Sequence, residues 1–154
     1  NAVLVVDDLY VDADGDGLSN KWEWDHGFDP LSHGTDDPMS SANGDADNDG
    51  IANLLEAIFL LDPRVKNTEA LLVPRREEDA WIIDYTRSST EPASLYIEWS
   101  QDLQHWLKPG DAEYPAGALD IDLNTGDPGE QNRRIVLPIT NTAGFVRWLA
   151  HPDR

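Results

Sequence analysis

The sequence contains no cysteine and few basic residues. The absence of cysteine excludes disulfides, thiolate metal sites and cysteine nucleophiles. Only 11 Lys and Arg residues stand against 30 Asp and Glu residues, which gives a formal net charge of -19 at pH 7. This charge repels nucleic-acid phosphates and anionic lipid surfaces. We therefore expect no nucleic-acid partner, and we expect the acidic groups to serve cations.

Long hydrophobic runs are also absent. No apolar stretch reaches the roughly 20 residues that a membrane-spanning helix needs, so we expect no membrane insertion. The hydrophobic content of 40%, with six Trp residues, is enough for a modest core and too high for general disorder. The chain begins at Asn1 instead of Met, and we expect it to be part of a longer polypeptide.

An internal repeat occupies the N-terminal part of the chain. A shift of 33 residues aligns the first loop, residues 12–23, with the second loop, residues 45–56. The same shift superimposes Asp29 on Asp62, and each of these precedes a proline. A repeat of this kind predicts two structurally equivalent units.

Both loops have the ligand spacing of a calcium site. A twelve-residue calcium loop supplies oxygens from positions 1, 3, 5, 7, 9 and 12, with glycine at position 6. Gly17 and Gly50 occupy position 6. Position 7 contributes its backbone carbonyl, position 9 binds directly or through water, and position 12 offers both carboxylate oxygens. The predicted ligands are Asp12, Asp14, Asp16, Leu18, Asn20 and Glu23 in the first loop and Asp45, Asp47, Asp49, Ile51, Asn53 and Glu56 in the second.

The donor set indicates which ion is bound. All donors are oxygens, whereas zinc prefers His and Cys, and magnesium keeps its waters and demands tighter octahedral geometry. Four carboxylates in one loop repel each other unless a cation is present, so metal binding should be coupled to folding. We predict two calcium ions per chain.

Each loop should continue into a helix, without a helix before it. In the second unit the apolar positions lie three and four apart and share one helical face: Ile51, Leu54, Leu55, Ile58 and Leu61. We expect the first helix to be shorter and to bury Leu18, Trp22 and Phe28. Gly27 stands where a helix C-terminus takes a left-handed residue.

The remainder of the chain has the pattern of short strands. Apolar or alternating runs occur at residues 71–74, 80–85, 95–99, 106–107, 134–139 and 145–150, separated by clusters of Gly, Pro, Asn and Asp. This pattern is typical of an antiparallel sandwich. The predicted fold class is therefore α+β, with a pair of calcium loop–helix units in residues 1–70 and a small β-sandwich in residues 71–154.

The first loop reads Asp-Ala-Asp-Gly-Asp-Gly-Leu-Ser-Asn-Lys-Trp-Glu. Together with its second copy it resembles the EF-hand-like calcium repeats of thrombospondin type 3 and dockerin-like modules in secreted bacterial proteins, over residues 11–63. The resemblance implies a calcium-stabilised spacer or connector outside the cell, attached to a larger parent polypeptide. Ser19 and Ala52 stand at position 8, where paired EF-hand loops usually bridge through a β-branched residue.

The later part of the chain offers a looser resemblance. Residues 97–106 and 145–148 are similar to small β-sandwich domains that follow such repeats in large secreted bacterial proteins. The chain has no nucleophile elbow, phosphate loop or paired zinc histidines, so we expect no enzyme. We expect a non-catalytic accessory module of a secreted or cell-surface protein, with a role in spacing, attachment or stabilisation.

An alternative is a binding module in which calcium only braces the structure. The β-sandwich would then bind a polysaccharide or a cell-surface protein. Aromatic rings exposed on one face can form a sugar-stacking platform, although we expect most of those on the predicted strands to lie in the core. The four tryptophans on these strands are Trp81, Trp99, Trp106 and Trp148.

Two further acidic features remain open. Asp29 and Asp62 precede prolines and are expected to begin turns, with a contact to the metal as the alternative. Residues 120–124 alternate like the start of a third loop, but Thr125 and Gln131 replace the required glycine and glutamate.

Overall fold

We describe the protein from a computed structural model, in which residues 9–68, 72–123, 127–138 and 144–152 are described. The chain divides into two compact units. The first comprises Asn1–Glu69, Ser88–Ser94 and Ala150–Arg154, and the second comprises Ala70–Arg87 and Leu95–Leu149. That residues 1–70 and 71–154 fold as separate domains stays a prediction, because two later segments group with the N-terminal part.

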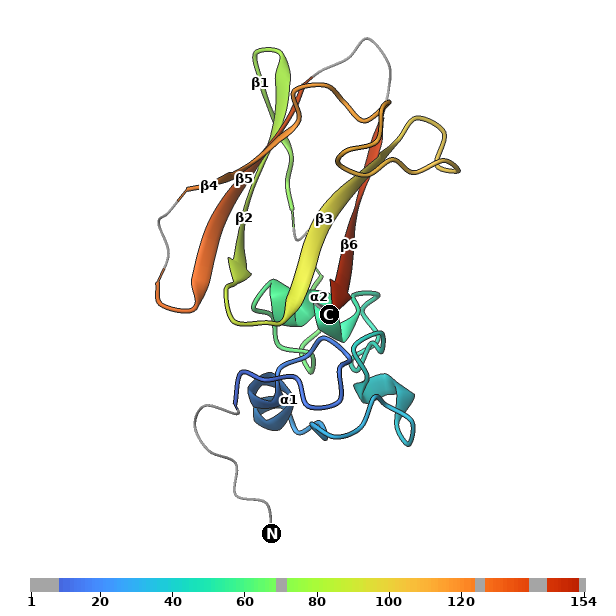
Figure 1. Cartoon of the computed structure of the whole chain (residues 1–154), viewed down its shortest axis with the longest axis vertical. Coiled ribbons are helices and arrows are strands. Elements are labelled where there is room, and N and C mark those ends of the chain that lie inside the picture. Colours follow the sequence, from blue (N-terminus) through green and yellow to red (C-terminus); the bar gives the residue numbers. More distant parts are fainter. Residues whose placement is uncertain (1–8, 69–71, 124–126, 139–143, 153–154) are drawn as a thin grey trace. The chain divides into compact units, whose positions relative to one another are not determined.

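The first unit contains two short α-helices, each of which begins at position 9 of its loop (Figure 1). They are α1 (Asn20–His26) and α2 (Asn53–Ile58), with the 3-10 helix η2 (Pro38–Ser40) between them. In α1 the Ser19 hydroxyl accepts a hydrogen bond from the Trp22 N–H at 3.2 Å. Gly27 follows α1 with a φ of 75°, in the left-handed region, as predicted.

The relative helix lengths differ from the prediction. The first helix has 7 residues and the second has 6, so the expectation of a shorter first helix is wrong. The Ser19 cap stabilises the start of α1, whereas Ala52 at the start of α2 offers no side-chain cap. After Ile58 the chain leaves the helix, and Leu60 has a φ of 60°, so Leu61 lies outside α2.

The core of the first unit is built around both helices. Trp22 packs edge-on against Phe28, with ring centroids 5.2 Å apart. The predicted inward-facing residues of the first helix are confirmed as buried, and Leu54 and Ile58 of α2 are buried as well. Two charged residues, Glu23 and Glu56, also lie inside this core.

The segment around η2 joins the two loops within the first unit. The Ala42 N–H donates to Asp16 Oδ2 of the first loop at 3.1 Å, and the Ala42 carbonyl accepts from the Leu54 N–H at 2.9 Å. The Asn53 side chain donates to the carbonyls of Met39 and Ser41 at 2.8 and 2.7 Å. These bonds fix the start of α2 against the first loop.

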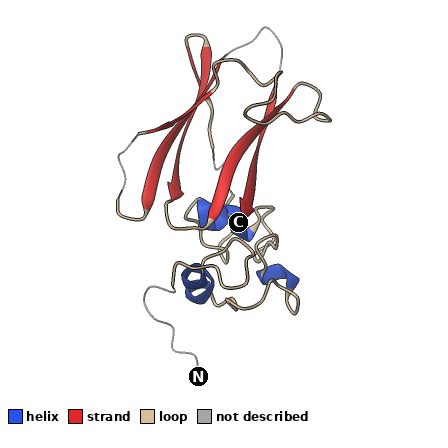
Figure 2. Ribbon diagram, viewed as in Figure 1, coloured by secondary structure: helices blue, strands red, loops and turns tan. Residues whose placement is uncertain are grey.

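The second unit is built from β-strands, which form two sheets (Figures 1 and 2). The larger sheet has the order β1-β2-β5-β4, and β3 pairs with β6 in the smaller sheet. Glu78 and Asp79 form the tight turn between β1 and β2, and Glu78 has a φ of 45°. The strands are β1 (Arg75–Glu77), β2 (Ala80–Ser88), β3 (Ala93–Ser100), β4 (Leu119–Asp122), β5 (Glu130–Pro138) and β6 (Phe145–Pro152).

The antiparallel, β-rich character of this part is confirmed. In the β1–β2 pair Arg76 lies opposite Trp81, and in the β4–β5 pair Ile121 lies opposite Arg134. The buried apolar side chains come from β2, β3 and β5: Ile82, Ile83, Tyr85, Ile97, Ile135 and Leu137.

Three strand predictions need correction. The first strand occupies Arg75–Glu77, and residues 72–74, within the predicted 71–74, are not strand, while residue 71 lies outside the described residues. Residues 106–107 contribute only an isolated bridge between Trp99 and Leu107. Strand β4 was not predicted, because its alternating aspartates resembled a calcium loop and all four of its residues are exposed. Within the described residues, no helix has the length and apolar character needed to cross a membrane.

Candidate metal centre

Both loops make the sharp backbone turn that a metal loop requires. Gly17 and Gly50 at position 6 have φ values of 103° and 97°. Residues with a Cβ rarely adopt this conformation, so glycine is needed here. Position 4 also has a positive φ, 80° at Gly15 and 60° at Asn48, and asparagine tolerates the left-handed region better than most residues.

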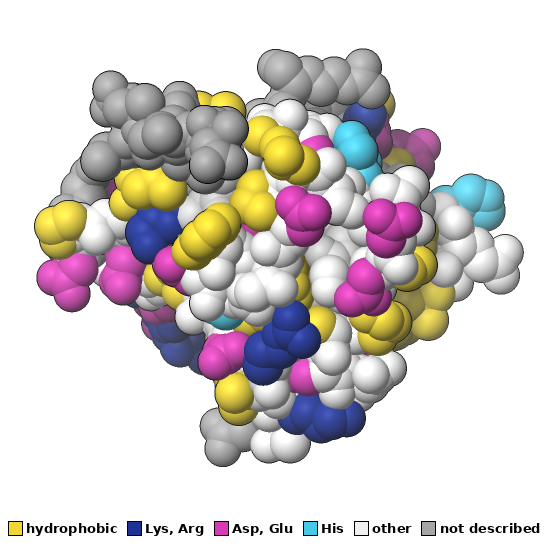
Figure 3. Space-filling model, turned by 90° about the horizontal axis from the view of Figure 1, so that it is seen from below, with side chains coloured by type: hydrophobic (Ala, Val, Ile, Leu, Met, Phe, Trp, Pro, Cys, Tyr) yellow, Lys and Arg dark blue, Asp and Glu magenta, His cyan; other side chains and the backbone are white. Residues whose placement is uncertain are grey.

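The turn gathers three aspartates in each loop. The carboxylates of Asp12, Asp14 and Asp16 offer oxygens that all lie within 4.8 Å of one another. The aspartates of the second loop, at 45, 47 and 49, form an equivalent triad within the same distance. Figure 3 shows acidic side chains among apolar and basic ones on one face of the molecule. Either triad could hold a metal ion.

Backbone N–H groups orient the first aspartate of each loop. Asp12 Oδ2 accepts from the Gly17 N–H at 2.8 Å, and Asp45 Oδ2 accepts from the Gly50 N–H at 2.8 Å. A carboxylate oxygen has more than one lone pair, so these bonds leave acceptor capacity for a cation. The glycine at position 6 therefore both turns the chain and positions the carboxylate at position 1.

The glutamates at position 12 are the most unusual groups in the loops. Glu23 and Glu56 are 0% exposed, and neither oxygen of either carboxylate has a hydrogen-bond partner. Asp14 Oδ2 and Asp47 Oδ2 are also buried without a partner. Burying unpaired polar atoms is costly, and native proteins almost always satisfy them. These oxygens fit a bound cation, which would satisfy them.

The same arrangement changes the proton affinity of the glutamates. Burial raises the pKa of Glu23 to about 9, and the three aspartates of its loop add to the effect. Burial raises the pKa of Glu56 to about 7, again with contributions from the aspartates of its loop. The pKa values of Asp14 and Asp47 are raised by burial as well. A bound cation would favour the charged carboxylates and reverse these shifts.

The asparagines at position 9 close the loops. Asn20 Oδ1 accepts from the Ala13 N–H at 3.0 Å, and Asn53 Oδ1 accepts from the Ala46 N–H at 3.2 Å. Each amide oxygen thus serves the backbone at position 2 of its own loop. Because an amide oxygen has two lone pairs, both predicted modes of contact at position 9, direct and through water, stay predictions. The carbonyl contacts of Leu18 and Ile51 stay predictions.

Glu91 belongs to the surroundings of the first loop, and sequence reasoning missed it. Its two carboxylate oxygens accept hydrogen bonds from the Ser19 N–H at 3.0 Å and the Ser19 hydroxyl at 3.2 Å. Ser19 occupies position 8 of the first loop. Because its N–H is bonded to Glu91, this N–H does not bridge to the second loop. Glu91 lies 72 residues away, and no local pattern could have indicated the contact.

The other acidic candidates have different roles. Asp29 Oδ1 accepts from the Leu31 N–H at 3.1 Å, and Asp62 Oδ1 accepts from the Arg64 N–H at 2.9 Å, which confirms that both residues begin turns. In the proposed third loop, Asp120 and Asp122 lie in β4. Both form ion pairs with Arg133, at 3.0 Å for Asp120 and 3.8 Å for Asp122. Residues 124–126 lie outside the described part.

The strand tryptophans are less buried than predicted. Trp81 is 43% exposed, and Trp99, Trp106 and Trp148 are half-buried, so the expectation that most lie in the core is wrong. The Arg147 guanidinium lies over the Trp106 ring, 4.2 Å from its centroid. Arginine stacking partly covers this ring without burying it.

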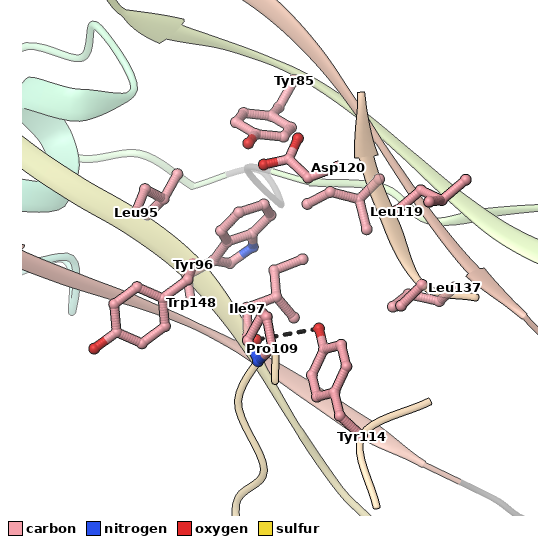
Figure 4. A pocket seen from close by; sticks show the side chains of 12 residues that line it. Tyr85, Leu95, Tyr96, Ile97, Pro109, Tyr114, Leu119, Asp120, Leu137 and Trp148 are labelled. Atoms are coloured by element: carbon pink, nitrogen blue, oxygen red, sulfur yellow. Dashed lines mark hydrogen bonds between the residues drawn. The ribbon is translucent and has the colours of Figure 1, made fainter. Parts of the chain in front are cut away.

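A cavity of about 120 Å³ lies within the second unit, between side chains of both sheets (Figure 4). The rings of Tyr85 and Trp148 meet edge to face there, with centroids 5.0 Å apart, and the Tyr114 hydroxyl donates to the Ile97 carbonyl at 3.3 Å. Burial raises the pKa of Tyr85 to about 12, and the nearby Asp120 carboxylate adds to the shift. The lining is mainly apolar and aromatic, which suits a small apolar group.

Comparison with protein families finds one match in the first loop. The model of the bacterial TSP3 repeat matches residues 12–33, which include the first loop and α1. The matched segment supports the thrombospondin type 3-like character predicted for the repeat. The comparisons with curated proteins and with solved structures give no match.

Proposed function

We propose that the protein is a calcium-binding, non-catalytic accessory module of a larger secreted or cell-surface protein. The observation that carries this proposal is the set of buried, unpartnered carboxylate oxygens that recurs in both loops. Each set stands next to an aspartate triad, so each loop concentrates negative charge at one point. The match to the bacterial TSP3 repeat supports the same proposal.

Calcium is the ion that this donor set fits best. Every candidate side-chain ligand is an oxygen, and the glutamate at position 12 has both oxygens available for bidentate binding. Calcium accepts six to eight oxygens in flexible geometry, whereas magnesium prefers a tighter octahedron that retains water. Millimolar calcium outside cells would keep even modest sites occupied, which supports an extracellular location.

The ions would act mainly on stability. Two divalent cations would change the formal net charge from -19 to about -15 and would relieve repulsion inside the loops. Because Glu23 lies in α1 and Glu56 lies in α2, each ion would hold an aspartate triad and the adjoining helix together. This role suits spacing, attachment or stabilisation within a longer polypeptide.

Isothermal titration calorimetry of the full chain tests the proposal. We expect two calcium ions per chain, and Glu23→Gln or Glu56→Gln should remove one site each because the bidentate charge is lost. Asp36→Asn is the matched control, since it removes one exposed acidic charge outside both loops. A stoichiometry of zero, or unchanged binding in both glutamate variants, would refute the proposal.

A second candidate function is ligand binding by the β-strand unit, with calcium as a structural ion only. The cavity of Figure 4 and a second, wider depression beside β3 favour this candidate. The cavity of Figure 4 is smaller and mainly apolar, whereas the wider depression combines an aromatic ring with polar side chains. The wider depression therefore gives the more specific support for ligand binding by the β-strand unit.

A further inference from the structure

The wider depression lies at the end of β3 and the loop that follows it. Its volume is about 230 Å³, and every residue that lines it belongs to the second unit. The lining residues are Trp99, Gln101, Asp102, His105, Leu107 and Glu113.

The loop beside the depression is held by hydrogen bonds at both its base and its tip. Trp99 and Leu107 exchange backbone hydrogen bonds of 2.8 Å in each direction, which closes the base. The Ser100 hydroxyl accepts from the Leu103 N–H at 2.9 Å, and Asp102 Oδ1 accepts from the His105 N–H at 2.8 Å. Because the loop is already ordered, binding of a ligand here would need little additional loss of conformational entropy.

The depression has an apolar side and a polar side. Trp99 and Leu107 provide the apolar side, and a Cβ at Gly144 would collide with the Trp99 indole, so the glycine makes room for this ring. Gln101 and Glu113 are exposed on the polar side. His105 also lies there, with its Nδ1 2.6 Å from Asp102 Oδ2, which leaves Nε2 as the outward-facing ring nitrogen.

The charges of these groups restrict the class of ligand. Asp102 and Glu113 repel anions, and the net charge of -19 adds to this effect. The Asp102 carboxylate already bonds to His105 within the chain, which makes it less available to an organic cation. The amide, imidazole and carboxylate groups together offer both donors and acceptors, as hydroxyl groups require. A neutral molecule with several hydroxyls and one apolar face meets all these conditions.

We propose that this depression binds one sugar unit of a neutral polysaccharide, with the sugar ring against Trp99 and its hydroxyls bonded to Gln101, His105 and Glu113. The proposal rests on the second candidate function and names its ligand class. It does not depend on two exposed tryptophans on one face. Trp99 and Trp106 lie on opposite faces, because Trp99 pairs with Leu107, the neighbour of Trp106.

Binding to defined polysaccharides tests the proposal. The full chain, saturated with calcium, is incubated with insoluble cellulose and chitin and is run in affinity gels that contain soluble β-glucan, galactan or mannan. We expect retention by at least one of these neutral polymers. Trp99→Ala should weaken the interaction about tenfold or more, as expected for a central aromatic contact. Glu113→Ala changes an exposed side chain, and it should weaken binding by a smaller factor without affecting folding.

Trp81→Ala is the matched control, because Trp81 is 43% exposed in the same unit and does not line the depression. We expect this variant to bind like the unmodified chain. The proposal would be overturned if none of the polymers retained the chain. It would also be overturned if Trp99→Ala and Glu113→Ala were both retained as strongly as the unmodified chain. Calcium titration of the same preparation separates the outcomes: two bound ions without polysaccharide binding would refute the sugar site alone.

Discussion

Buried glutamates of the first unit and Asp84 of the second unit differ in their partners within the chain. In the second unit Asp84 bonds to Arg134 at 2.7 and 2.9 Å and to Arg75 at 2.7 Å, and these contacts lower its pKa to about 2. In the first unit Glu23 and Glu56 have no hydrogen-bond partner, and burial raises both pKa values. Under the proposed function, cations from the solvent would neutralise the loop carboxylates of the first unit, whereas the chain itself supplies Arg75 and Arg134 to Asp84 of the second unit.

Removal of calcium should produce the largest difference in stability between the two units. A ligand at 100 times its Kd stabilises the folded state by about 2.7 kcal/mol per site, so EDTA should destabilise the first unit by about twice that amount for two sites. Hydrogen–deuterium exchange with and without EDTA measures the effect in each unit. We expect faster exchange in α1 and α2 and little change in β2 and β5. An equal response in all four elements would show that the units unfold together.

Loss of the first helix cap should have a moderate effect. Ser19→Ala removes the hydroxyl that bonds to the Trp22 N–H and to Glu91, and loss of an N-cap typically costs about 1 kcal/mol. The matched change in the second loop, Ala52→Ser, introduces a cap residue where none exists and should stabilise α2. Urea unfolding in saturating calcium measures both variants. A stability gain in Ser19→Ala would contradict the assigned cap.

Loss of the Asp84 ion pairs in the second unit should have the smallest effect. Because the folded-state pKa of Asp84 is lowered from 3.8 to about 2, its stabilising contribution is present above pH 3.8 and is lost as the pH falls towards 2. Asp84 is 38% exposed, so solvent screening limits the contribution to less than about 1 kcal/mol. Asp84→Asn should therefore reduce stability slightly at pH 7 and have a smaller effect near pH 2.

Urea unfolding of Asp84→Asn at both pH values, with Asp79→Asn as an exposed control in the turn before β2, checks this prediction. The same difference at pH 2 and pH 7 would argue against the ion pairs. The variant should leave the calcium stoichiometry unchanged, because Asp84 belongs to the second unit.

The loop geometry could be predicted because its determinants are local. The spacing of Asp12, Asp14 and Asp16 places their carboxylates together once Gly17 turns the chain, and all four residues are near neighbours in the sequence. The burial of Leu18 followed from helical periodicity for the same reason.

Features that depend on distant segments could not be predicted. The contact of Glu91 with Ser19 joins residues far apart in the chain, and strand β4 is held by pairing with β5 and by the ion pair between Asp120 and Arg133. The exposure of the strand tryptophans depends on which sheet covers which face. A two-residue alternation indicates two faces, but it does not say which of them is covered.

The first unit is assembled from three separate segments of the chain, which affects the order of folding during synthesis. The unit combines Asn1–Glu69 with Ser88–Ser94 and Ala150–Arg154, so the chain leaves it and returns twice. Gly17 lies against Pro152, and a Cβ at this glycine would approach the proline ring to 2.9 Å. A nascent chain can therefore form each loop early, but it can complete this packing only after Pro152 has left the ribosome.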